Sequence, residues 1–377
     1  MSVNNSTYSG KQFEVYIATD ASVGNKFVVG NWSGANRLDV EGITLPSFAP
    51  TQEFEMRSGS GRIAEFDQIF STSKRVITEF TLSGRLTFEA WTILLENVLS
   101  TELAGTDASL MTVPLSYAPT NFGDSDAIAS VTTYSKTLSV NFKSPTSADD
   151  SYTLTGCVCT SLSVDADMDS SSGRFNYSAT FQTMYAPIKG TQSVTSATAI
   201  GSNFIFLPDL DDKILGVMKY DGDTSDDDIE PLFKTFNLSI ESPTQFLGAQ
   251  GANAEPEVFA RATPELTINF GGTIKYDELT DNMIEAFRDA RTAGTSPSYI
   301  FLYLSDVDKA AGTYEVPTGS LIFAAGSTSK FGFQCAKAKL TSAEVSSDDV
   351  AMLSFEAKVL EPASGATAYF LAGDNAV

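Results

Sequence analysis

The stretch VITEFTLSGRLTFEAWTILLENVLS, residues 76–100, decides the fold because its pattern occurs twice in the chain. In this first copy, apolar and polar residues alternate, as in a half-buried strand. The strand leads to Ser83-Gly84 and then to an amphipathic helix. The second copy, LTINFGGTIKYDELTDNMIEAFRDA at residues 266–290, has the same order of parts. Aligned without a gap, the equivalent pairs are Phe80 and Ile268, Leu82 and Phe270, Gly84 and Gly272, and Phe88 and Tyr276.

Both predicted helices carry a single apolar stripe. Its spacing of about 3.6 residues predicts that one face of each helix packs into a core. Acidic residues near each helix start, such as Glu89 and Asp277, suit the positive end of the helix dipole. We interpret the aromatic members as core residues rather than as cofactor contacts. The stripes comprise Phe88, Trp91, Leu95 and Val98 in the first helix, and Tyr276, Leu279, Met283 and Phe287 in the second.

Two further landmarks recur in the same order in each half. A Pro-Thr-Gln triplet begins at Pro50 and again at Pro243, each time after a predicted strand. The cysteine-bearing stretches at 157–187 and 333–362 each predict a strand, a turn and a returning strand. The turns fall at Asp169–Gly173 and Ser346–Asp349. The chain is therefore predicted to hold two tandem domains, 1–190 and 204–377, joined by a polar linker at 191–203, while the insertion at 106–136 predicts a strand or two of its own.

Composition limits the classes of function. The 377 residues carry a formal charge of −23, which favours solubility and repels nucleic-acid phosphate. The chain start lacks the order of a secretory signal, and no apolar run approaches the ~20 residues of a membrane span. We therefore expect synthesis in a cytosol and no membrane binding. Three cysteines are too few for a disulfide framework, and Cys157 and Cys159 are expected to be buried thiols on one face of a strand.

The chain contains no histidine. This removes the commonest general base, the commonest metal ligand and every Ser-His or Cys-His nucleophile. Carboxylate pairs, lysines and tyrosines could still serve an enzyme. We expect no catalytic residues and no cofactor, with a carboxylate-based or nucleotide-dependent enzyme as the weakest alternative.

Residues 57–66, RSGSGRIAEF, fit the glycine pattern G-x-G-x-x-A of dinucleotide-binding turns. Such a turn follows a buried strand directly and opens a helix. Here Glu55 and Arg57 interrupt the incoming segment, and the corresponding slot of the second half, FLGAQGANAEPEVFARATPEL, lacks the pattern. Both slots are instead interpreted as flexible interaction arms or, more simply, as surface loops. The arm residues are Met56, Arg57, Gly59, Gly61 and Arg62 in the first half, and Phe246, Gly248 and Gly251 in the second.

Aspartates gather in YDGDTSDDDIE, residues 220–230. An EF-hand needs glycine at its sixth position and glutamate at its twelfth, but counting from Asp221 gives Asp226 and Leu232. The EF-hand pattern therefore fails. A calcium site of another geometry, with Asp221, Asp223 and Asp227 as ligands, remains an alternative to a solvated turn.

The order of elements resembles the tail tube domain of long-tailed bacteriophages. The stretch VEGITLPSFAPTQEFEMRSGSGRIAEFDQIFSTSKRVITEFTLSGRLTFEAW, residues 40–91, is most similar to major tail proteins. The doubled pattern resembles major tail proteins in which one chain carries two tube domains. The resemblance implies a mainly β fold, with two tandem antiparallel β-sandwich or barrel domains, each with one flanking α-helix and a long arm loop.

The same resemblance implies a structural virion protein. Six such domains would form a ring, so three chains would form a trimer with pseudo-six-fold symmetry, and rings would stack into a tail tube. Double-stranded DNA would pass through the lumen without specific binding. The partners implied are the tape measure protein and the tail-tip and terminator proteins. The protein would be assembled in the host cytoplasm and located in the phage tail.

Strand edges also tend to be closed for a physical reason that is independent of the family, because open sandwich edges expose unpaired backbone groups.

An alternative function is a tandem β-sandwich surface or adhesion module that binds Ca²⁺ at its Asp-rich loop. On the tube hypothesis, carboxylates outnumber basic groups on the channel wall, so that DNA is not held there.

Overall fold

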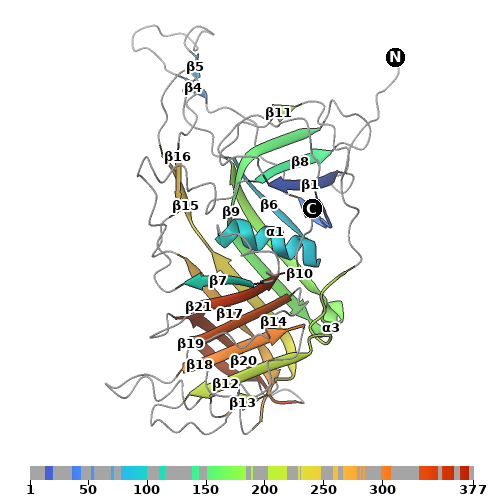
Figure 1. Ribbon diagram of the computed structural model, residues 1–377, viewed down its shortest axis with the longest axis vertical. Helices are drawn as coiled ribbons and strands as arrows, with labels where there is room; N and C mark the ends of the chain where they lie inside the picture. The colour runs from blue at the N-terminus through green and yellow to red at the C-terminus, as the bar shows by residue number, and fades with distance from the viewer. Residues whose placement is uncertain are drawn as a thin grey trace.

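A computed structural model describes the chain in segments (Figure 1). The described residues are 13–19, 36–43, 52–54, 69–71, 78–99, 110–114, 138–143, 151–183, 188–189, 203–218, 228–229, 231–247, 258–261, 266–277, 281, 283–284, 299–306, 331–346, 350–360 and 366–372. Antiparallel strands dominate these segments, and most of them belong to one hydrogen-bonded sheet. The predicted mainly β class is therefore confirmed.

The elements follow the chain in two series. The first series is β1 (Glu14–Thr19), β2 (Asn36–Leu38), β3 (Gly42–Ile43), β4 (Gln52–Phe54), β5 (Ile69–Ser71), β6 (Thr78–Arg85), α1 (Phe88–Leu99), β7 (Leu110–Pro114), β8 (Leu138–Lys143), β9 (Tyr152–Asp167), α3 (Met168–Ser171), β10 (Phe175–Thr183) and β11 (Ile188–Lys189). The second is β12 (Asp212–Met218), β13 (Asp228–Ile229), β14 (Phe233–Glu241), β15 (Thr244–Leu247), β16 (Val258–Arg261), β17 (Thr267–Lys275), β18 (Tyr299–Ser305), β19 (Phe331–Ser346), β20 (Met352–Val359) and β21 (Ala366–Ala372).

The strand pairings repeat from one series to the next. In the first, β9 pairs with β8, β10 and β11, and β10 continues to β6. In the second, β19 pairs with β18, β21 and β20, and β20 continues to β17. β9 and β19 each bulge once against the returning strand, at Thr160 and Thr341. Equivalent bulges fix equivalent registers, because a one-residue slip would turn every side chain to the other face.

The two series join through β9 and β14. The carboxyl-terminal half of β9 pairs along its free side with β14, from Ser161 opposite Glu241 to Asp167 opposite Thr235. A continuous run of strands results, in the order β3, β6, β10, β9, β14, β17, β20, β19. The predicted domain limits remain a prediction. Residues 204–207 follow the proposed linker and are tied to the first series, through bridges of Phe204 to Thr87 and of Phe206 to Arg174.

The strands that were predicted to end before their glycines are longer in the structure, because both run straight through them. β6 extends to Arg85 and β17 to Lys275. A Cβ on Gly84 would collide with the backbone oxygen of Asp39, and one on Gly272 with the backbone oxygen of Thr235. The glycines are therefore explained by the close approach of a neighbouring strand, which leaves no room for a side chain.

Helix α1 confirms the first predicted helix and its core stripe. Trp91, Leu95 and Val98 are fully buried, and the hydroxyl of Thr87 caps the helix by accepting from the amide of Ala90 at 3.2 Å. The burial extends beyond the stripe, because Ile93 and Leu94 are buried too. Figure 1 shows α1 across the middle of the molecule, and its contacts include both β9 and β21. Burial on two sides explains why a single stripe underestimates the apolar surface of this helix.

Only part of the second predicted helix is described. Asp281, Met283 and Ile284 are helical, and the amide of Asp281 donates to the carbonyl of Asp277. Met283 is fully buried, as its place in the stripe predicts. Leu279 and Phe287 lie outside the described residues.

The insertion at 106–136 contributes β7, a strand of its own as predicted, but β7 pairs with β21 of the second series. Cys157, Cys159 and Cys335 are buried free thiols. Burial raises the pKa of the Cys335 thiol to about 12, so this side chain stays protonated at neutral pH and is no nucleophile.

Candidate functional surface

One face of the eight-strand run is polar and open, whereas the other packs into the core. Along β10, buried and partly exposed residues alternate without interruption. The other long strands follow the same period of two, which turns every second side chain to the open face. We call this surface the open face.

The open face of the first series is lined by small hydroxyl side chains. Ser83, Ser178, Ser163 and Ser239 stand opposite one another on β6, β10, β9 and β14, and so form one row across four strands. In the next row, the hydroxyls of Thr81 and Thr180 are 3.2 Å apart. The serine row carries no charge, but the threonine row ends at the exposed Glu241 of β14. The row beside the serines carries Arg85 and Asp165, and the row beside the threonines carries Glu79.

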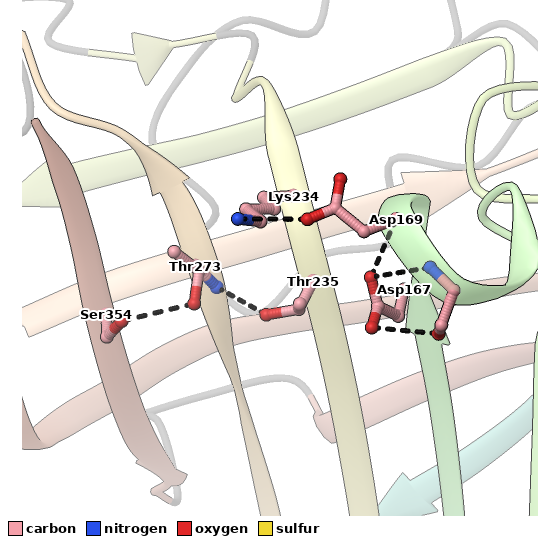
Figure 2. Close-up of polar contacts among 7 residues, drawn as sticks. Asp167, Asp169, Lys234, Thr235, Thr273 and Ser354 are labelled. Carbon is pink, nitrogen blue, oxygen red and sulfur yellow. Dashed lines mark hydrogen bonds and ion pairs between the residues drawn. The ribbon is translucent and has the colours of Figure 1, made fainter. Parts of the chain in front are cut away.

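The second series presents charges of both signs on the same face. Glu356 and Lys358 on β20, and Lys339 and Glu344 on β19, are all exposed. Their neighbours on β14 and β17 remain uncharged. The amide of Thr273 donates to the hydroxyl of Thr235 at 3.0 Å, and the Thr273 hydroxyl lies 3.1 Å from that of Ser354 (Figure 2). The two series thus share a backbone plan, and each carries charges of both signs on this face.

The run of strands ends in two edges that lack a partner among the described residues, one at β3 and one at the carboxyl-terminal half of β19. The β19 edge corresponds to the side of β9 that β14 covers. Val164 in β9 lies four residues after its bulge and is 1% exposed, whereas Val345 lies four residues after the bulge of β19 and is 45% exposed. Both face the core side of the sheet. The difference in exposure marks the place where a neighbouring strand is lacking.

Helix α3 forms the rim between β9 and β10. The sequence predicts a turn here, and the structure forms a single helical turn capped by the carboxylate of Asp167. That carboxylate accepts from the amides of Asp169 and Ser170 at 2.8 and 3.4 Å, and from the Ser170 hydroxyl at 2.9 Å. Asp169 also lies 3.0 Å from the ammonium of Lys234 on β14 (Figure 2). The rim therefore links the two series on the open side of the β9–β14 junction.

The stability that the Asp167 cap gives to α3 is expected to depend on pH. The hydrogen bond from the Asp169 amide, followed by that from the Ser170 side chain, lowers the pKa of Asp167 below its usual value of 3.8. Because the folded pKa is the lower one, the stabilising contribution is fully present above pH 3.8 and is lost as the pH falls through the folded pKa. Amide chemical shifts of Asp169 and Ser170, followed by NMR, should titrate below pH 3.8 in the natural chain. Asp167→Asn should remove this titration. An unchanged titration in the variant would contradict the cap.

Each predicted arm lies between the two strands of a short antiparallel hairpin. β4 pairs with β5 on either side of residues 55–68, and β15 pairs with β16 on either side of residues 248–257. A stretch that returns antiparallel beside its own incoming strand differs from a dinucleotide-binding turn, in which a helix follows directly. Phe246 lies in β15, opposite Phe259. Met56, Arg57, Gly59, Gly61, Arg62, Gly248 and Gly251 lie outside the described residues.

The aspartate run also lies largely beyond the described segments. Asp221, Asp223 and Asp227 fall outside them, and Asp228 lies in β13. Within the described segments there is no group of three or more His, Cys, Asp or Glu side chains placed to hold a metal ion. No helix in these segments is long and apolar enough to cross a membrane.

Sequence reasoning missed the open face. Its signal was present in the alternating Ser and Thr of the cysteine-bearing strand and its return, since a period of two places them on one side. A scan against protein-family models finds no match to the sequence, and a search of curated proteins finds none either.

Proposed function

We propose that this protein is a structural subunit that closes with copies of itself into rings, and that the rings stack into a tail tube. The observation that carries the proposal is the β9–β14 ladder. It joins two similar series of strands in one chain and leaves the corresponding edge of β19 uncovered. At the other end of the run, the outer edge of β3 also has no partner strand within the described segments. The β3 strand of a second copy could therefore pair with β19, in the same way as β14 pairs with β9 within one chain.

Burial supports this arrangement. Val345 is nearly half exposed on the core side of the sheet, whereas its counterpart Val164 is buried beside β14. At the β3 edge, Ile43 is only partly buried and packs against the core. Burying an aliphatic side chain of this size contributes about 1.5–3 kcal/mol. Natural sheets rarely leave such edges open, because open edges recruit other chains.

In this proposal, the open face lines the bore of the ring. Duplex DNA binds proteins mainly through Lys and Arg contacts to its phosphates. The basic groups on the described part of this face, such as Arg85 and Lys358, are accompanied by carboxylates that oppose such binding. Three chains would supply six domains. The tail tube, the trimer, the passage of DNA, the tape measure, tail-tip and terminator partners and the location in a virion all belong to this proposal, as does the absence of catalysis.

The oligomeric state tests the proposal. Mass photometry of the purified chain over a range of concentrations should show a species of three subunits, each of 40.3 kDa. Negative-stain electron microscopy should show rings with a central hole, and stacks of rings at higher concentration. A chain that stays monomeric at every concentration, with no rings on the grids, would overturn the proposal.

A further inference from the structure

The open face contains one hollow, of about 320 Å³, within the second series. Side chains from four adjacent strands line it: Thr235, Asn237, Thr273, Ser342, Glu344 and Glu356. The backbone of Gly272 contributes to the same hollow. Gly271 stands between Asn237 and Glu356 in the sheet, so one row across these strands lacks a side chain at its centre. Thr235, Thr273 and Ser354 line this hollow and form a hydrogen-bonded row across three strands (Figure 2).

The corresponding place in the first series has other side chains, although its strands pair in the same way. The residue after each bulge is a serine, Ser161 in β9 and Ser342 in β19. Across the strands, Ser161 is followed by Thr180 and Thr81, whereas Ser342 is followed by Glu356 and Gly271. Likewise, Ser163 is replaced by Glu344. A bonded pair of threonines thus fills the position that glycine and glutamate leave open in the second series.

The lining of the hollow offers acceptors and negative charge. Every side chain named above carries an oxygen, and no basic residue lines the hollow. Asn237 is the one member that also carries nitrogen donors. Glu344 and Glu356 supply two carboxylates, and both are exposed. A ligand for such a site must carry several donors and a positive charge.

The size of the hollow selects among cations. A water molecule occupies about 30 Å³ of liquid, so a volume of 320 Å³ is far larger than a bare ion needs. Among the described residues, no group of three or more His, Cys, Asp or Glu is placed to hold a metal ion, and this hollow contributes only two carboxylates. A guanidinium group carries five N–H donors in a planar fork and binds carboxylates in a bidentate manner. Its donors match the hydroxyl, amide and carboxylate oxygens that surround this space.

We propose that this hollow binds the guanidinium group of an arginine presented by an extended polypeptide. Glu356 and Glu344 accept its N–H groups, and the Asn237 amide oxygen with the neighbouring hydroxyls accepts the remainder. Binding requires only that the open face is accessible, so it does not depend on ring closure. In a ring whose bore is lined by this face, the ligand would be a polypeptide lying within the bore.

A labelled peptide tests the site directly. The probe is a fluorescent glycine-serine peptide with one central arginine, and its binding to the full chain is followed by fluorescence anisotropy at low salt. Two matched peptides replace the arginine with lysine or with citrulline, which keeps the shape of arginine but not its charge. We expect the arginine peptide to bind at least about tenfold more tightly than the citrulline peptide, because hydrogen bonds between charged partners are the stronger kind.

Variants locate the binding. Glu356→Gln keeps the shape of the side chain and should weaken binding of the arginine peptide about tenfold or more, and Glu344→Ser with Glu356→Thr, which copies the first series, should abolish it. Glu241→Thr removes an exposed glutamate of β14 that does not line the hollow, and should leave binding unchanged. Circular dichroism confirms that each variant is folded.

Three results would overturn the inference. The first is equal binding of the arginine and citrulline peptides. The second is full binding by the Glu344→Ser, Glu356→Thr chain. The third is displacement of the arginine peptide by micromolar MgCl₂ or CaCl₂ through Glu356, which would show a metal site instead. Each of these outcomes is distinct from a failure to form rings, because the peptide is measured on the chain whatever its oligomeric state.

Discussion

Replacing Val345 with aspartate is expected to leave the single chain folded and to abolish the closure into rings that we propose. The side chain is 45% exposed in the isolated chain, so the aspartate remains in water there. In a ring, the same side chain would lie in the position that Val164 occupies beside β14, where 1% of its surface is exposed. Burying an unpaired carboxylate there would strongly oppose closure.

Loss of burial sets a lower limit on the effect. Full burial of a valine contributes about 1.5–3 kcal/mol, and about 1.4 kcal/mol corresponds to a tenfold change in an association constant. Because 45% of the Val345 side chain is still exposed, about half of that contribution is lost, which weakens each junction by roughly 3- to 10-fold. The cost of burying the aspartate adds to this loss at every junction of a ring. Mass photometry at a fixed concentration should show rings for the natural chain and monomers for Val345→Asp.

The control for this experiment is Val350→Asp. Val350 is 60% exposed and lies just before β20, beyond the end of β19. It carries the same chemistry but takes no part in the uncovered edge, so its rings should have the mass of the natural ones. Melting temperatures of both variants should match that of the natural chain. Rings of full mass in Val345→Asp would contradict the role of the β19 edge.

Replacing Trp91 with alanine is expected to cause the largest loss of stability among single substitutions in α1. The indole is fully buried, its ring lies 5.0 Å from that of Phe331 and 6.1 Å from that of Phe370, and its N–H donates to the carbonyl of Leu371 at 2.8 Å. All three partners belong to the second series. Truncation of a buried tryptophan costs about 3–5 kcal/mol, and the substitution would also leave a buried carbonyl without its donor.

Urea denaturation measures this loss as a decrease in the free energy of unfolding. The matched variant Trp91→Phe keeps an aromatic ring against Phe331 but removes the indole donor, and should lose about 1–3 kcal/mol. Because Trp91 joins the helix of one series to strands of the other, Trp91→Ala should also broaden the transition. A loss below about 1 kcal/mol would contradict the packing of α1 between the two series.

Repetition and periodicity predicted most of the fold. The alternation around Phe80 and Phe270 predicted β6 and β17, and the stripe containing Trp91 predicted α1 as a core helix. These patterns report which face of an element is apolar, but not how many neighbours it has. The stripe therefore could not predict that α1 is also buried on a second side, against β21. Ile93 and Leu94 extend the apolar surface beyond the stripe, which agrees with this second contact.

The glycines show a different limit of sequence reasoning. A glycine after a strand was interpreted as its end, but Gly84 and Gly272 lie inside strands, where a neighbouring backbone approaches. That approach depends on tertiary contact and has no local signal. Between β9 and β10 the sequence predicted only a turn at Asp169–Gly173, whereas the structure forms a helical turn whose amides the Asp167 carboxylate caps. The hollow could not be predicted, since its walls come from four strands between residues 235 and 356.

The β9–β14 ladder has a kinetic consequence. Because both strands belong to one polypeptide, their encounter is intramolecular and does not depend on protein concentration. Dilution does not slow this step. If closed rings are built from such chains, half of the junctions between strand series already exist within the single chains. Ring formation then requires three molecules to associate rather than six.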